Sequence, residues 1–226
     1  MSGITRIQTS REDSRRPAQQ DRPAGKEIWL KDGDQVFLTS IATGDENDTL
    51  LDELYLYTFR VGNRWMTVLK DERVDDTDVP DDTRPSHKFA FWAYVHEVIH
   101  AEKRVAEWEE IEGPSGKRLF KETVNDYRVI SLGFGRSDYI WNQLVDVYSD
   151  WGALNKGVMR IKRTGAGMYD TSYQISATPK KDEIPKDKVA EAKELAVIKE
   201  YFFERYGGFT APSENESSKE KDDELF

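Results

Sequence analysis

The chain has 226 residues and a net charge of −10, and 37% of its residues are hydrophobic and 12% aromatic. It has no cysteine, which excludes disulfides, thiolate metal ligands and cysteine nucleophiles. No apolar run is long enough to span a membrane, and no apolar segment near the N-terminus resembles a signal peptide, so we expect a cytoplasmic protein without a membrane partner.

The N-terminal part of the chain predicts a flexible arm followed by three strands. Residues 1–26 are polar and show no hydrophobic periodicity, which is typical of a flexible arm. Order is expected over residues 27–209, which we interpret as one domain with inserted loops. Its first strand is predicted at 36–43, and a hairpin of two strands at 54–60 and 65–69 follows.

The first strand of this hairpin places three aromatic residues, Tyr55, Tyr57 and Phe59, on one face. The other face carries Leu54, Leu56 and Thr58. A half-buried strand normally alternates apolar and polar residues. Here either both faces are covered or one of them is a binding surface. The second strand begins with Trp65, a further aromatic candidate.

The middle of the chain predicts an acidic loop, a strongly apolar element, a strand and a helix. The loop covers 71–86, and the apolar segment 89–98 is either a strand or the start of a longer helix. A strand is predicted at 127–132. A helix follows, with Ser137 as its N-cap and Gly152 as its stop signal.

The last ordered elements are predicted to be a hairpin and a C-terminal helix. The strands of the hairpin are expected at 157–164 and 169–178, and the helix at 186–206. This order predicts a mainly β fold with α additions: an OB-like Greek-key barrel with inserted loops, a short helix before the last hairpin and a C-terminal helix. A generic α+β domain fits nearly as well.

The hairpin near the C-terminus combines cations with aromatic rings. Single-strand binding needs cations that follow the backbone and rings on which bases stack. The hairpin supplies both, as Arg160, Lys162, Arg163, Tyr169 and Tyr173. An ordinary solvated hairpin is the alternative interpretation, since Tyr and Thr favour strands in any case.

Two acidic segments account for most of the net charge, which would otherwise disfavour nucleic acid binding. Residues 71–84 carry a net charge of −5 and residues 212–226 one of −4, so the remainder is near neutral.

The tail, residues 210–226, is expected to be disordered. It ends in Asp222, Asp223, Glu224, Leu225 and Phe226. A terminal Phe with its carboxylate can enter an apolar pocket rimmed by cations, so this tip is predicted to bind partner proteins; simple solubilisation is the alternative.

Two stretches carry a resemblance to a known family. The segment SLGFGRSDYIWNQLVDVYSDWG, followed by GVMRIKRTGAGMYDTSYQI, resembles phage-encoded single-stranded DNA-binding proteins of the T4 helix-destabilising type. The acidic tip ending in Phe is similar to the tips of bacterial and phage single-stranded DNA-binding proteins. The resemblance implies an OB-fold, no catalysis, and coating of single strands during replication or recombination in the cytoplasm of an infected bacterium. It also implies recruitment of replication or recombination proteins by the tail.

The chain departs from this family in one respect. The T4-type protein holds a structural zinc with His and Cys ligands, and because this chain has no Cys we expect no metal or other cofactor. The residues predicted to bind DNA are the stacking candidates Tyr57, Phe59, Trp65, Tyr169 and Tyr173, and the phosphate-binding candidates Arg160, Lys162 and Arg163.

The motif His96-Glu97-x-x-His100 suggests a competing function, a zinc metallopeptidase. On a helix it would place both His on one face with Glu97 as general base, and Glu122 lies where a third ligand could follow. On a strand the two His would be about 13 Å apart, too far for one metal. Two further interpretations stay open: a phage accessory protein without DNA binding, and a binder of duplex DNA or RNA.

Overall fold

The computed structural model describes residues 26–207, apart from positions 63, 78, 167–169 and 180–182. The acidic tail and the expected arm, except for Lys26, lie outside the described residues. The described chain is mainly β with a few helices, as predicted. It divides into two compact units. The sheet unit holds residues 26–54 and Ser86–Tyr201, and the hairpin unit holds Tyr55–Pro85 and residues 202–207.

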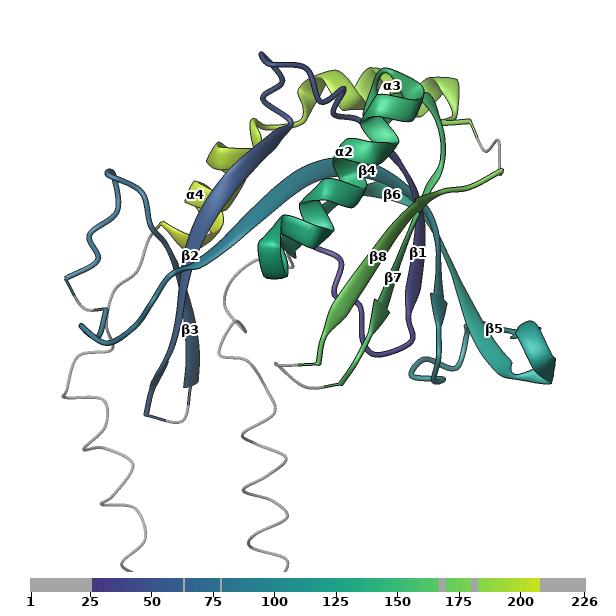
Figure 1. Cartoon of the computed structure of the whole chain (residues 1–226), viewed down its shortest axis with the longest axis horizontal. Helices are drawn as coiled ribbons and strands as arrows, with labels where there is room; N and C mark the ends of the chain where they lie inside the picture. Colours follow the sequence, from purple (N-terminus) through teal and green to yellow (C-terminus); the bar gives the residue numbers. More distant parts are fainter. Residues whose placement is uncertain (1–25, 63, 78, 167–169, 180–182, 208–226) are drawn as a thin grey trace, which may run out of the picture. The chain divides into compact units, whose positions relative to one another are not determined.

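Six complete strands form an antiparallel sheet in the described part of the sheet unit, in the order β5-β6-β4-β1-β7-β8 (Figure 1). Their bounds are β1 Gln35–Ser40, β4 Ser86–His100, β5 Glu109–Glu112, β6 Arg118–Gly133, β7 Met159–Thr164 and β8 Ser172–Ala177. Strand β1 pairs with β4 on one side and with β7 on the other. No pairing joins β6 to β8 among the described residues, so the predicted closure into a barrel is not found.

The main core lies on one face of this sheet, and strand alternation sorts the side chains of β7 between that face and the other. In β7, Met159 and Ile161 are buried, whereas Arg160 and Lys162 are only partly covered. Helix α2 (Tyr139–Trp151) packs against the buried face. Its buried side chains recur at helical spacing, as Ile140, Leu144 and Val147.

Helix α2 also covers the outer edge of β8, the last strand of the sheet. The Gln143 side-chain amide donates to the Tyr173 carbonyl at 3.2 Å and accepts from the Ile175 N–H at 2.8 Å. One side chain therefore supplies the two hydrogen bonds that a further strand would make at this position.

The segment 89–98 is part of a strand, β4, so the helical alternative for it is wrong. Strand β6 is much longer than the predicted 127–132, and β5 was not predicted. The reason is that residues 118–126 are largely polar and give little alternating signal, while pairing with β4 and β5 supplies their hydrogen bonds.

The prediction of Ser137 as the N-cap of α2 is wrong. Ser137 lies within the 3-10 turn Arg136–Asp138 with φ of 51°, and the N-cap residue is Asp138, whose side chain makes no capping bond. The Ile140 N–H instead donates to the Phe134 carbonyl at 2.8 Å. The stop at Gly152 is confirmed, since this residue has φ of 73° and its N–H donates to the Tyr148 carbonyl.

The single C-terminal helix predicted at 186–206 is wrong. The segment forms α3 (Lys186–Glu191), a 3-10 turn (Ala192–Glu194) and α4 (Ile198–Tyr206). Between them the backbone is extended at Leu195. The indole N–H of Trp92 donates to the Ala196 carbonyl at 2.9 Å, and the Ile198 N–H donates to the Thr49 carbonyl at 3.0 Å. These bonds to the sheet unit outweigh helix propensity, which favours an unbroken helix only weakly.

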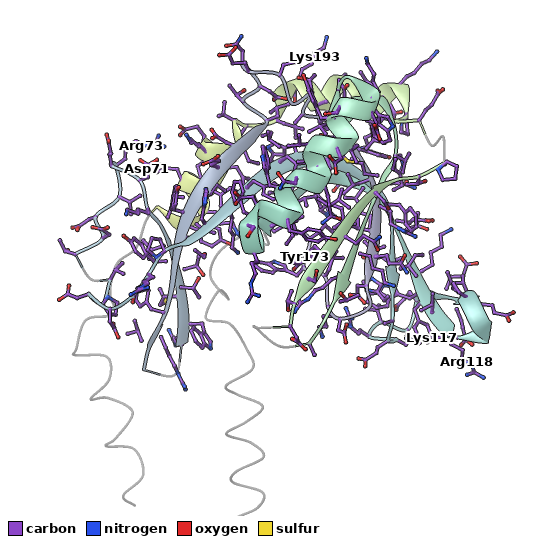
Figure 2. All side chains as sticks on the ribbon, in the orientation of Figure 1. Asp71, Arg73, Lys117, Arg118, Tyr173 and Lys193 are labelled. Atoms are coloured by element: carbon purple, nitrogen blue, oxygen red, sulfur yellow. The ribbon has the colours of Figure 1, made fainter. Side chains whose placement is uncertain are left out.

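The hairpin unit contains the predicted hairpin of β2 (Leu51–Val61) and β3 (Arg64–Leu69), which is confirmed. The pairing runs from Leu56 opposite Leu69 to Val61 opposite Arg64, and the first four residues of β2 belong to the sheet unit. In the loop after β3, Arg73 pairs with Asp71 at 2.9 Å and lies 4.1 Å from the Phe203 ring centroid (Figure 2).

No helix in the described part of the chain is long and apolar enough to cross a membrane.

Candidate nucleic-acid interface

Two of the predicted phosphate-binding residues lie side by side on the face of the sheet opposite α2, which we call the outer face. Arg160 and Lys162 occupy alternate positions of β7, and both are partly exposed. In the neighbouring strand, Phe37 lies opposite Arg160 and Gln35 opposite Lys162. The outer face thus combines two cations with one partly exposed ring. Phe37 was not singled out from the sequence, although its position between the apolar Val36 and Leu38 in a predicted strand already indicated an outward side chain.

Arg163 and Tyr173 are not brought together with that pair. They lie opposite each other in β7 and β8, on the face that α2 covers. The Arg163 guanidinium donates to the Leu30 carbonyl at 2.6 Å and to Thr171 Oγ1 at 3.1 Å. Burial raises the pKa of Tyr173 above 10.0, and the charge of Arg163 opposes this rise. Tyr173 (labelled in Figure 2) packs against the core, and Arg163 fastens the hairpin.

The structure corrects the interpretation of Tyr57 and Phe59 as stacking surfaces. Both are buried, with exposed fractions of 9% and 6%. Buried residues occur on both faces of β2, and on the face of Tyr57 and Phe59 only Tyr55, at 41% exposed, presents an aromatic ring to solvent among the described residues.

Trp65 has the opposite environment, at the start of β3 in the hairpin unit. Its side chain is 56% exposed, and it lies directly opposite Arg60 in the β2–β3 register. Arg64 precedes it, and both arginines are exposed. An indole therefore lies in solvent with one arginine across the hairpin and another next to it in the chain.

A second exposed tryptophan lies in the sheet unit. Trp29 is 69% exposed and precedes Leu30, whose carbonyl accepts the Arg163 bond. Nothing in the sequence distinguished Trp29 from a core residue. Of the remaining predicted site residues, Tyr169 and the tail tip lie outside the described residues; the tip comprises Asp222, Asp223, Glu224, Leu225 and Phe226.

The His96-Glu97-x-x-His100 motif lies on β4, so its two histidines do not share a helical face. A bulge interrupts the pairing of this strand with β6 between Val95 and Glu97. His96 Nε2 lies 2.9 Å from Thr39 Oγ1. His100 Nε2 lies 2.9 Å from Glu122, the suggested third ligand, but His96 does not join them. Among the described residues, no three histidine or carboxylate side chains gather so that they could hold a metal ion.

His100 instead belongs to a buried ionic cluster at the end of the core. Its Nδ1 lies 3.2 Å from Asp34, which is fully buried, and Trp108 stacks on its ring at a centroid distance of 3.7 Å. Burial by itself would raise the pKa of Asp34. Hydrogen bonds from His100, from the Lys31 and Ala101 N–H groups and from Arg104 outweigh that effect and lower the pKa to about 2.

The cluster also positions the basic hairpin. The Arg163 N–H donates to the Asp34 carbonyl at 3.0 Å, and the Gly33 N–H donates to the Arg163 carbonyl at 3.0 Å. The turn that holds the buried carboxylate is therefore bonded directly to β7.

No protein-family model matches the chain, and no curated protein matches it. Its function is therefore inferred from the geometry described above.

Proposed function

We propose that this chain is a non-catalytic single-stranded DNA-binding protein that stacks bases on outward aromatic rings and neutralises phosphates with adjacent cations. The observation that carries the proposal is Trp65, a large apolar ring that is 56% exposed and lies directly opposite Arg60 in the β2–β3 register. Residues directly opposite in an antiparallel pair have Cβ atoms about 5 Å apart, so a base on the indole would bring its phosphate within reach of an arginine.

Arg160 and Lys162 make a second contribution, within the sheet unit. They lie two positions apart on one strand face, and Phe37 lies across from Arg160. Stacking on one aromatic ring is worth about 1–3 kcal/mol per base and tolerates any sequence. Affinity from these features would depend on salt and little on base sequence.

The strand connectivity supports the finer form of the proposal, an open OB-like barrel. β1 pairs with both β4 and β7, and α2 lies in the chain between β6 and β7. Barrels of this type bind oligonucleotides. With the acidic tail as a partner-binding segment, the protein would coat single strands during replication or recombination, in the cytoplasm of an infected cell if it is phage-encoded.

A fluorescence titration with oligo-dT tests the stacking. We expect salt-sensitive quenching of tryptophan emission in the wild type, and about tenfold weaker binding with less quenching for Trp65→Ala. Tyr139→Ala is the matched control, because Tyr139 is 58% exposed but lies on α2. An absence of quenching and binding in the wild type would contradict the proposal, as would equal losses in both variants.

The same titration at several salt concentrations tests the cations. Removing two phosphate contacts to a single strand should reduce the slope of log affinity against log salt by about 1.4. We expect this for Arg160→Ala with Lys162→Ala, and no change for Lys117→Ala with Arg118→Ala, exposed cations near the β5–β6 turn (Figure 2). A duplex of matched length should bind more weakly; stronger duplex binding would indicate the duplex-binding alternative.

A further inference from the structure

Strands β4 and β6 carry large aromatic residues on the outer face as well as in the core. Trp92 and Tyr94 alternate with core residues along β4, and Tyr127 lies opposite Tyr94 in β6. Their exposed fractions are 3%, 1% and 1%. His96 continues the row, with its ring 5.1 Å from that of Tyr94. We call Trp92, Tyr94, His96 and Tyr127 the aromatic strip.

The segment that lies over the strip, residues 183–197, buries none of its own side chains. It contains α3 and the 3-10 turn Ala192–Glu194, and we call it the cover. The next residue, Ile198, is fully buried and fixes the C-terminal end of the cover. The main cost of opening the cover is therefore exposure of the strip's rings to water, a cost that bases stacked on the same rings would offset by covering them again.

The strip holds the cover largely through main-chain carbonyls. The Tyr127 hydroxyl donates to the Lys188 carbonyl at 2.6 Å, and the Trp92 indole donates to the Ala196 carbonyl at 2.9 Å. Each such bond contributes about 1 kcal/mol net. Both strip groups are donors, so a ligand that replaces the cover must present acceptors.

An open cavity lies at one end of the strip. It is lined by Tyr94 and His96 of the strip and by Pro185 and Lys188 of the cover, and its charged lining residues are Glu97, Glu183, Asp187, Lys121 and Lys188. Asn125, which also lines it, has a positive φ of 46° in the bulged part of β6. Because Tyr94 and His96 are only 1% and 8% exposed, this cavity ends at the margin of the strip, and a ligand meets the rings only once the cover moves.

We propose that residues 183–197 are a displaceable cover, and that the aromatic strip beneath them is a second surface on which single-stranded DNA stacks its bases. This inference rests on the proposed function and extends it to a site that is closed in the unbound protein. Nucleic acid matches the chemistry, because base carbonyls, ring nitrogens and phosphates supply the acceptors that the indole and the phenol would need.

A cation on the same face supports this choice. Lys88 lies on β4 in the alternation that continues to Trp92 and Tyr94. Burial lowers the pKa of Lys88 below 10.5, and the charge of Glu27 opposes that change. A phosphate bound here would favour the charged form of Lys88 in the same way.

Hydrogen exchange of the full chain, with and without saturating oligo-dT, tests the cover. We expect the amides of residues 186–196 to exchange at least about fivefold faster in the complex, because the bases displace the segment. Oligo-dT binding with unchanged or slower exchange would overturn the cover and leave the proposed function intact. An absence of binding in the fluorescence titration would overturn both.

Tyr127→Phe provides an independent readout. It removes the bond to Lys188 but keeps the ring, so the cover should open more readily and oligo-dT should bind about fivefold more tightly. Tyr148→Phe is the matched control, because the Tyr148 hydroxyl bonds only to the exposed Asp45 at 3.3 Å among its described contacts. Unchanged or weaker binding by Tyr127→Phe would show that the cover is a fixed part of the fold. Faster exchange caused by a protein partner, but not by oligo-dT, would overturn the proposal and assign the strip to that partner.

Discussion

Asp34 is a fully buried carboxylate that remains ionised because donors surround it. The guanidinium of Arg104 lies 2.9 Å from both of its oxygens, and the N–H groups of Lys31 and Ala101 donate to it. Removing one member of such a cluster leaves the remaining charges buried without a partner, which is more costly than losing the whole cluster.

We expect the stability of the protein to fall in acid because of this residue. The folded pKa of Asp34 is about 2, below the ordinary 3.8. Its contribution, about 2 kcal/mol, is therefore complete above about pH 4 and is lost as pH falls towards 2. Urea unfolding from pH 7 to pH 2 should show Asp34→Asn about 3 kcal/mol less stable than the wild type at pH 7, with a smaller loss in acid. Asp75→Asn, at an exposed position, is the control and should have nearly the wild-type stability at each pH. If the stability of Asp34→Asn fell with pH in parallel with that of the wild type, Asp34 would not be the source of the acid sensitivity.

At the residue scale, the sequence indicated which residue types could bind DNA but not which of them are accessible. Tyr57, Phe59 and Trp65 belong to the same predicted hairpin, yet two are buried and one is exposed. Burial depends on what packs on a strand face, and that is decided by segments distant in the chain. Arg160 and Arg163 also differ in environment. Strand alternation places them on opposite faces of β7, and only the face of Arg163 is covered by α2.

Among the elements, the β7–β8 hairpin depends on one glycine at the end of β7. Gly165 has φ of 91°, and a Cβ at this position would lie 2.1 Å from the Asp170 carbonyl oxygen. A side chain here would have to displace the backbone on the opposite side of the hairpin. Gly62, in the β2–β3 turn, also has a positive φ of 57°, but a Cβ added there would meet nothing within 4 Å among the described residues.

These two glycines allow a matched comparison. Gly62→Ala should cost about 1 kcal/mol, the ordinary penalty of a left-handed backbone. Gly165→Ala should cost about 3 kcal/mol, because the clash adds to that penalty. Denaturant unfolding with both variants measures the difference. Equal losses would mean that the β7–β8 connection adapts without strain.

Hairpins were the elements best predicted from the sequence. Both the β2–β3 and β7–β8 pairs are flanked by strong turn signals, and local chemistry is enough to define them. The break between α3 and α4 was not predicted, because it results from bonds to Trp92 and Thr49 far away in the chain. The polar first half of β6 is a strand for the same reason.

For the whole molecule, the repulsion that a DNA strand would meet depends more on where the negative charges lie than on the net charge. The net charge is −10, but residues 212–226 contribute −4 and residues 71–84 contribute −5. Most of the repulsion that a DNA strand would meet therefore comes from two segments. The tail would compete with phosphates for the same cations.

We expect a chain that ends at Phe209 to bind oligo-dT several-fold more tightly than the full chain at low salt. The advantage should shrink as salt rises, because screening weakens the tail's competition. Fluorescence titration of both chains measures this. Replacement of Leu225 and Phe226 by Ala preserves the acidic charge and should leave DNA affinity unchanged. Equal affinity of the truncated and full chains at low salt would rule out competition by the tail.

The Gln143 bonds to Tyr173 and Ile175 affect how copies of this protein would interact at high local concentration. Proteins that coat a strand lie at high local concentration, where exposed sheet edges invite one copy to add its strand to the next and so start fibre growth. In this chain the Tyr173 carbonyl and the Ile175 N–H, at the centre of the β8 edge, are already hydrogen-bonded to the Gln143 side chain of the same molecule. If the chain coats DNA as we propose, neighbouring copies would lie close together while this edge stays closed to amyloid-like extension.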